Sequence, residues 1–220
     1  MSDSRRIESV KQGKGRRSRL VDVVFEDGGE AIALHAEAAQ QGGIYTGAMV
    51  TEEQLATAAD ASMRLQAREA AWRLIEHRPR SRVELLRGMA RRGIPPEIAE
   101  QTVAALEAGG YINDETYARQ LAEEGRRHGD GSRRVEARLR QRGVAAETAR
   151  SAAAEGRTTE ADAAAARTLL ERWNRRSSPA DTTKRRMAAA RFLAARGYDA
   201  DVVWRVVAQV LKGAGDDSPE

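Results

Sequence analysis

The chain has 220 residues with a formal net charge of +4 and a sequence pI near 9.7, and 32% of its residues are charged but only 4% aromatic. It contains no cysteine, which excludes disulfide frameworks, cysteine-liganded zinc sites and thiol catalysis. No segment approaches the roughly 18 apolar residues that a membrane-spanning helix needs. We therefore expect a cytoplasmic protein that does not enter a membrane.

The first 19 residues are dominated by arginine and lysine, with Asp3 and Glu8 as their acidic residues and with Gly13 and Gly15 as breaks. Charge of one sign with few apolar residues is typical of a flexible segment, so residues 1–19 are predicted to be a flexible basic arm. The glycines do not form a phosphate-binding loop, because the spacing is wrong and no Ser or Thr follows the lysine.

Residues 20–50 are predicted to form a small β-hairpin followed by a connector. Val23 and Phe25 belong to an alternating apolar pattern, Asp27-Gly28 supplies a turn, and Leu34 belongs to the returning strand.

From Thr51 the apolar period becomes helical. Thr51-Glu52-Glu53-Gln54 is a capping box that opens a helix, and the apolar stripe continues until Pro79. Ser81-Arg82-Val83-Glu84 is a second capping box and opens the next helix. This region is predicted to be a linking helix followed by the first of several helical modules.

Three glycines, Gly93, Gly143 and Gly197, each follow an Arg-rich helical segment, and they lie 50 and 54 residues apart. An apolar residue follows each glycine, and an acid lies four residues after it. This is the pattern of a helix that ends on a left-handed glycine and of a second helix that begins with an acid in its first turn. The spacing fits a module of about three short helices.

The sequence therefore predicts a mainly α fold: a tandem array of three three-helix repeats, elongated and of undetermined curvature, preceded by the small N-terminal β-hairpin region. The predicted divisions are the basic arm (1–19), the hairpin and connector (20–50), the linking helix with repeat 1 (51–112), repeat 2 (113–157), repeat 3 (158–212) and an acidic tail (213–220).

No catalytic, cofactor-binding or metal-binding residues are predicted. The histidines His35, His77 and His128 lie far apart in different elements and have no neighbouring acids at ligand spacing. Neither a cofactor fingerprint nor a Ser, His and Asp set is present. We therefore expect a protein that is not an enzyme.

The candidate functional residues are arginines that recur near the second helix of each repeat and would suit phosphate groups or an acidic protein groove. They are Arg91, Arg92, Arg133, Arg134, Arg138, Arg185 and Arg186. Arg92 also has a purely structural interpretation, because arginine at a helix end caps free carbonyls. The pairs Arg133-Arg134 and Arg185-Arg186 lie at helix starts, where the helix dipole opposes positive charge, and this misfit favours a partner.

Two segments together resemble the RecX family of recombinase regulators. The first, Ala70–Leu86, contains Arg78-Pro79-Arg80-Ser81 and Glu84-Leu85, and the second, Gly110–Glu115, is followed by Tyr117-Ala118. Phe192–Tyr198 is similar to the last repeat of that family. The resemblance covers roughly residues 64–211 and implies tandem three-helix repeats, in agreement with the spacing.

The resemblance also implies a function. Such a protein is a negative regulator of homologous recombination and of the SOS response, which binds the filament of a RecA-type recombinase on single-stranded DNA, blocks its extension and inhibits its ATPase and strand-exchange activities. Some members also bind single- or double-stranded DNA. We expect a monomer whose several weak contacts add by multivalency.

Two alternatives stay open. One is a helix-turn-helix-like DNA-binding protein that acts without a recombinase, although no helix carries the Asn, Gln and Arg mixture that base reading needs. The other is a helical scaffold that binds an acidic protein.

Overall fold

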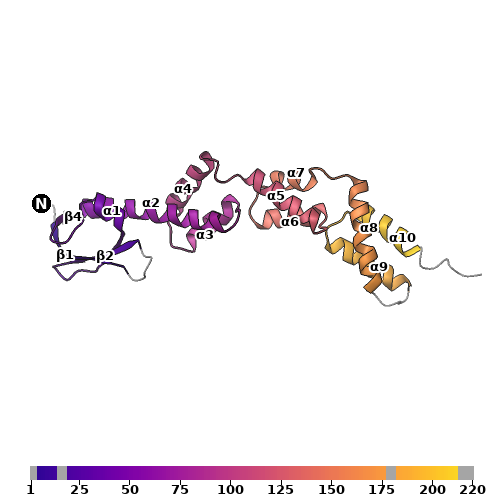
Figure 1. Cartoon of the computed structure of the whole chain (residues 1–220), viewed down its shortest axis with the longest axis horizontal. Helices are drawn as coiled ribbons and strands as arrows, with labels where there is room; N and C mark the ends of the chain where they lie inside the picture. Colours follow the sequence, from indigo (N-terminus) through magenta and orange to yellow (C-terminus); the bar gives the residue numbers. More distant parts are fainter. Residues whose placement is uncertain (1–3, 14–18, 177–181, 213–220) are drawn as a thin grey trace, which may run out of the picture. The chain divides into compact units, whose positions relative to one another are not determined.

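The computed structural model describes residues 4–13, 19–176 and 182–212, and Figure 1 shows the helices and strands. The chain divides into two compact units. The first runs to Arg80 and includes Leu85–Tyr111, and the second combines Ser81–Glu84 with the chain from Ile112 onward. Ser81–Glu84 contains the first turn of helix α3 (Arg82–Ala90). This turn therefore belongs to the second unit, and the rest of α3 belongs to the first.

Within the described residues, the first unit contains one antiparallel four-stranded sheet with the order β3-β2-β1-β4. The strands are β1 (Ser4–Gln12), β2 (Leu20–Phe25), β3 (Ile32–His35) and β4 (Met49–Thr51). The predicted hairpin is confirmed, because β2 pairs with β3 and Val23 lies opposite Ile32.

The prediction of a flexible arm is wrong for Ser4–Gln12, which is a strand with a neighbour on each side. Backbone hydrogen bonds to β2 and β4 hold this strand, so one fully buried side chain, Ile7, is enough to anchor it among exposed polar residues. Residues 1–3 and 14–18 of the predicted arm lie outside the described residues.

The sheet packs against two helices, α1 (Ala36–Gln41) and the start of α2 (Glu52–His77). Their shared core contains Phe25, Leu34 and Val50 from the sheet, and Leu55 from α2. The capping box at Thr51 is formed as predicted: its hydroxyl accepts from the Gln54 backbone N–H, and the Gln54 side chain accepts from the Thr51 N–H. The helix that begins there runs without a break for 26 residues.

The first repeat adds α3 (Arg82–Ala90) and α4 (Pro96–Ala108) to the end of α2. Leu85, Met89 and Val103 are fully buried. Gly93 has a φ of +75° between the two helices, as the glycine pattern predicted.

The second unit contains the two further repeats. Repeat 2 comprises α5 (Asp114–Arg127), α6 (Ser132–Gln141) and α7 (Ala146–Ala154). Repeat 3 comprises α8 (Thr159–Arg176), α9 (Thr182–Ala195) and α10 (Ala200–Lys212). Each repeat has its own apolar core, and Gly143 and Gly197 have φ values of +86° and +84°.

The predicted tandem array of three three-helix repeats is therefore confirmed. The predicted acidic tail, residues 213–220, lies outside the described residues. In the part of the chain that the structure describes, no helix combines the length and apolar character that crossing a bilayer requires.

Candidate partner-binding surface

Asp130, between α5 and α6, gathers three arginines around a carboxylate that is almost fully buried. Its Oδ2 accepts a hydrogen bond of 3.0 Å from Arg138, and its Oδ1 lies 3.3 Å from Arg134 Nε and 3.7 Å from Arg196 Nη1. The residue is only 4% exposed. Two of the predicted contact residues, Arg134 and Arg138, are therefore held by an acid of their own chain.

The arginines at the start of α6 also reach the third repeat. Arg134 donates to the backbone carbonyl of Ala195 at 3.0 Å, and Arg133 Nε lies 2.8 Å from the Asp199 carboxylate. Ala195 is the last residue of α9, where the helix dipole is negative. The positive charge at the start of the helix that carries Arg133 and Arg134 is thus matched by the negative end of α9. The unfavourable position of this arginine pair therefore has an explanation within the chain. Arg133 still exposes 69% of its side chain.

Backbone groups complete this contact, which we call the second junction: Gly131–Arg134 packed against Ala195–Asp199, with Asp130 beside it. The Gly131 N–H donates to the Arg196 carbonyl at 2.7 Å, and the Arg133 N–H donates to the Gly197 carbonyl at 3.2 Å. The backbones are so close that a Cβ on Gly131 would lie 2.3 Å from the Gly197 carbonyl carbon. Only glycine fits this position without a shift of the chain.

The two segments that carry the family resemblance meet in an equivalent contact, the first junction, where Ser81–Glu84 packs against residues of repeat 2 inside the second unit. The Ser81 hydroxyl donates to the Arg142 carbonyl, and the Arg82 N–H donates to Asp114 Oδ1 at 2.8 Å. The sequence analysis did not foresee this pairing, because the partners lie 61 and 32 residues apart.

A buried phenol connects the same residues. The Tyr117 hydroxyl donates to Glu84 at 3.1 Å and accepts from Arg142 at 2.8 Å. Burial raises the pKa of Tyr117 above its usual range; the Arg142 hydrogen bond opposes the rise and the Glu84 charge adds to it. The motif residues at this junction therefore have a structural role.

The predicted residues after α3 differ from each other. Arg92 donates to the Gly88 carbonyl at 2.8 Å and so caps its own helix, the structural interpretation that the sequence left open. Arg91 is exposed, and its side chain has no ion pair or hydrogen bond among the described residues.

The predicted pair on α9 divides in the same way. Arg185 donates to the Asn174 side chain at 2.7 Å and so ties α9 to α8. Arg186 is exposed and has no partner within the described ranges. The structure therefore brings Arg133, Arg134 and Arg138 together, leaves Arg91 and Arg186 accessible, and uses Arg92 and Arg185 internally.

The sequence analysis did not select an exposed ridge on α9. Lys184, Met187 and Arg191 are spaced so that they lie on one face of the helix, and all three are exposed. Met187 exposes 49% of its surface, and the two cations have no partner in the described part of the chain. We call these three residues the α9 ridge. Its signal in the sequence is helical spacing of cations around one apolar residue.

No metal site is evident in this part of the molecule: among the described residues, no group of three or more His, Cys, Asp and Glu side chains is placed to hold an ion.

The three repeats match models of known domains. The first, second and third three-helix domains of RecX match residues 67–106, 113–152 and 160–207. "Regulatory protein RecX" of Streptomyces coelicolor is 38% identical over 155 residues, which cover 70% of this chain and 81% of that protein. The protein of the same name from Deinococcus radiodurans is 32% identical over 152 residues, covering 68% and 71%.

Two solved structures share the fold at 18% sequence identity. A crystal structure of regulatory protein RecX aligns with 95% of this chain and 99% of its own, with a TM-score of 0.61. A crystal structure of RecX from Lactobacillus salivarius aligns with 68% of this chain and 97% of its own, with a TM-score of 0.62.

Proposed function

The chain belongs to the RecX family of regulatory proteins, and on this premise we propose that it is a negative regulator of homologous recombination and of the SOS response. It binds the nucleoprotein filament of a RecA-type recombinase, blocks filament extension, and lowers the ATPase and strand-exchange activities of the recombinase. It acts by binding and not by catalysis.

The observation that carries this proposal is the complete set of three family domains in tandem, each matched in its own repeat. A filament presents the same surface at every protomer, so a protein built from repeats can contact it at several points. Weak contacts of this kind add up to a stable complex when their spacing allows simultaneous engagement.

The contacts between the repeats divide the candidate residues into two groups. Arg91, Arg186 and the cations of the α9 ridge are exposed and without partners among the described residues, so binding a filament would not cost them an existing ion pair. Arg134 and Arg138 already surround Asp130, and their contribution to binding is expected to be smaller. Arg133 is intermediate, because it is paired with Asp199 but largely exposed.

The test is a DNA-dependent ATPase assay with a preformed recombinase filament on single-stranded DNA, together with a strand-exchange assay. Added at a few-fold excess over the filament, the protein should lower both activities. Unchanged ATPase and strand exchange would reject the proposal and would favour DNA binding without a recombinase.

The contact surface is tested by a triple variant of exposed cations, Lys184→Ala, Arg186→Ala and Arg191→Ala. The inhibitory concentration should rise about tenfold, since each exposed charge contributes several tenths of a kcal/mol or more to a charged interface. The control is Arg150→Ala, whose side chain is exposed and pairs within α7 with Glu147. Equal inhibition by the triple variant and the control would place the contact elsewhere.

A further inference from the structure

The first unit presents two exposed aromatic side chains in contact with each other. Trp72 of α2 is 40% exposed and Tyr111, just after α4, is 60% exposed. Their ring centroids are 4.7 Å apart and the rings are nearly perpendicular, at 76°. Single exposed aromatics are common, but two that contact each other form a contiguous apolar surface, which is a more frequent mark of a binding site.

The backbone fixes the position of the tyrosine ring. A Cβ on Gly109 would lie 2.8 Å from Tyr111 Cε2, so the ring occupies the space that the glycine leaves. Gly110, with a φ of +72°, turns the chain, and the Tyr111 N–H donates to the Leu106 carbonyl at 2.9 Å. The aromatic pair is therefore held in place before any ligand arrives, which reduces the entropy that binding would cost.

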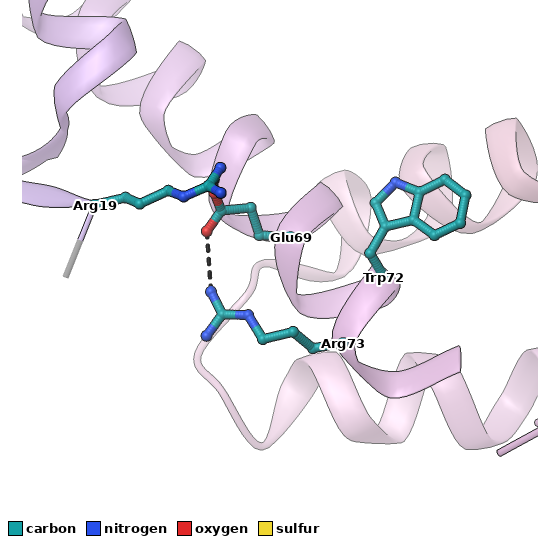
Figure 2. A pocket seen from close by; sticks show the side chains of 4 residues that line it. All are labelled: Arg19, Glu69, Trp72 and Arg73. Atoms are coloured by element: carbon teal, nitrogen blue, oxygen red, sulfur yellow. Dashed lines mark hydrogen bonds and ion pairs between the residues drawn. The ribbon is translucent and has the colours of Figure 1, made fainter. Parts of the chain in front are cut away.

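Trp72 borders two hollows in the surface of this unit. One, of about 690 Å³, is lined by Arg19, Glu69, Trp72 and Arg73 (Figure 2). The other, of about 340 Å³, lies between α2 and α4, and Arg64 and Arg68 line it together with the indole and apolar residues of α4. The indole therefore stands between two spaces that both have arginines in their walls.

The charge on both sides of the indole is positive. Figure 2 shows the guanidinium groups of Arg19 and Arg73 near the Glu69 carboxylate, with which they pair at 2.6 Å and 2.9 Å, while the Trp72 ring points away from this cluster. These two arginines expose 71% and 72% of their side chains, so they present outward N–H groups despite the shared acid.

The acid between them stays ionised and holds them in place. Burial acts to raise the pKa of Glu69, but the His35 hydrogen bond and the Arg19 charge outweigh it and lower the pKa. On the opposite side, Arg68 is exposed and has no partner among the described residues.

We propose that this surface binds single-stranded nucleic acid, with one base stacked on the indole of Trp72, against which Tyr111 packs at 76°, and with the flanking phosphates held by Arg68, Arg73 and Arg19. Aromatic faces bordered by cations are the chemistry of sequence-tolerant single-strand binding, because every base has a face that can stack. A duplex would not use the aromatic faces, since the faces of its bases are already stacked on one another. An apolar peptide segment would fill the hollows but would leave the arginines on both sides without anions.

This inference goes beyond the proposed function, because it requires no recombinase. The experiment therefore uses the full-length protein alone with a fluorescently labelled oligothymidine, and it measures affinity by anisotropy and tryptophan fluorescence in parallel. Trp72→Ala should weaken binding about tenfold, as expected for the loss of a single stacked base. The matched control is Trp204→Ala, because Trp204 is 51% exposed on α10 in the second unit.

Three further variants guard against loss of the fold in Trp72→Ala. Trp72→Phe keeps a ring at the site and should retain most of the affinity but abolish the fluorescence quenching that the oligonucleotide causes. Trp204→Phe should retain that quenching. Arg68→Glu, at an exposed position, should weaken binding as strongly as Trp72→Ala and should make the remaining binding less dependent on salt.

Equal affinities of the Trp72→Ala and Trp204→Ala proteins would overturn the proposal, as would quenching that survives in Trp72→Phe. The proposal would also be overturned if a duplex of the same length competed as effectively as the single strand, because equal competition would indicate binding through phosphates alone. A parallel titration with oligouridine shows whether the site prefers single-stranded DNA or RNA. Tighter binding of either single strand than of the duplex supports the proposal.

Discussion

The two junctions of the second unit place the same parts of the repeat together by different chemistry. In each, the start of the second helix of one repeat meets the glycine turn of the next: Ser81–Glu84 meets Arg142 and Gly143, and Gly131–Arg134 meets Arg196 and Gly197. The first junction uses the Ser81 hydroxyl to reach a turn carbonyl. The second uses the Gly131 backbone N–H for the same purpose.

This difference has a consequence for charge. At the first junction the contact is made through side chains: the Ser81 hydroxyl donates to the turn, Asp114 accepts from the Arg82 N–H, and Tyr117 donates to Glu84. Direct backbone contact at Gly131 leaves no room for such a group, and arginines arranged around Asp130 stabilise the contact instead. Part of the arginine enrichment that marks repeat 2 is therefore a requirement of packing and not of a partner.

The largest effect is expected at the junction glycines. Gly197→Ala should lower the free energy of unfolding by about 3 kcal/mol, because a Cβ there would lie 2.3 Å from the Arg134 backbone nitrogen and φ is positive. Gly143→Ala should cost nearly as much, since its Cβ would lie 2.4 Å from Val83 Cβ, which no rotamer change can move.

Gly93→Ala is the matched control for these variants in urea unfolding. Gly93 has the same backbone conformation, but beyond its chain neighbours no atom lies within 4 Å of the position that a Cβ would take. Its cost should therefore be about 1 kcal/mol, from φ alone. Equal losses at all three glycines would mean that neither junction depends on close packing.

Neutralising the acidic residue of each junction, Asp130 or Glu84, should lower the free energy of unfolding by less than the junction glycine substitutions do. Asp130→Asn should cost about 2–3 kcal/mol, because it leaves three arginines around a neutral group. Glu84→Gln should cost about 1 kcal/mol, because the amide oxygen can still accept from Tyr117. Thermal unfolding of both variants beside the parent protein tests the ranking. The reverse order would show that the first junction is the more dependent on charge.

A single hydroxyl should have a moderate effect. Ser81→Ala removes the hydrogen bond to the Arg142 carbonyl and the cap on the Glu84 N–H, and should cost about 1–2 kcal/mol in urea unfolding. Ser132→Ala is the control, because no hydrogen bond of the Ser132 side chain joins it to the turn of repeat 3 among the described contacts. A loss of stability in Ser81→Ala but not in Ser132→Ala supports the contrast between the two junctions. Equal losses of stability contradict it.

The smallest effect concerns alkaline pH. Burial raises the pKa of Tyr117 and of Tyr198 from the usual 10.0, with smaller contributions from neighbouring charges. The unfolded chain then ionises at a lower pH than the folded one, so this contribution to stability is complete below about pH 10 and is lost as the pH rises through the raised values.

Unfolding measured at about pH 8 and about pH 11 should show that Tyr117→Phe and Tyr198→Phe each reduce the alkaline loss of stability. Tyr45→Phe, at a phenol that is 65% exposed, is the control. An unchanged alkaline loss in both junction variants would show that these phenols do not ionise later in the folded protein.

Local patterns in the sequence were enough to predict the helices of the three repeats, but not α1, which lies in the predicted hairpin and connector. The capping box at Thr51 and the left-handed glycines at Gly93, Gly143 and Gly197 depend on residues a few positions apart, so the chain carries their whole signal. Strand β1 could not be predicted in this way, because it is held mainly by backbone ladders to β2 and β4 and buries little besides Ile7.

The candidate site was predicted less well than the fold. Arg133 and Arg134 were identified as misplaced charges, but their partners Asp199 and Ala195 lie more than 60 residues away and in another repeat. The aromatic pair was missed for the same reason: Trp72 and Tyr111 meet only when α2 and α4 pack together. Helical spacing alone could have indicated the α9 ridge.

The place of β1 within the sheet determines how the protein can be shortened. Deleting Ser4–Gln12 as an apparently dispensable basic leader would separate β2 from β4 and leave each with a row of unsatisfied N–H and C=O groups. Open edges of this kind recruit strands from other molecules. A truncated protein should therefore precipitate or self-associate, and an affinity tag is better placed ahead of these residues than in exchange for them.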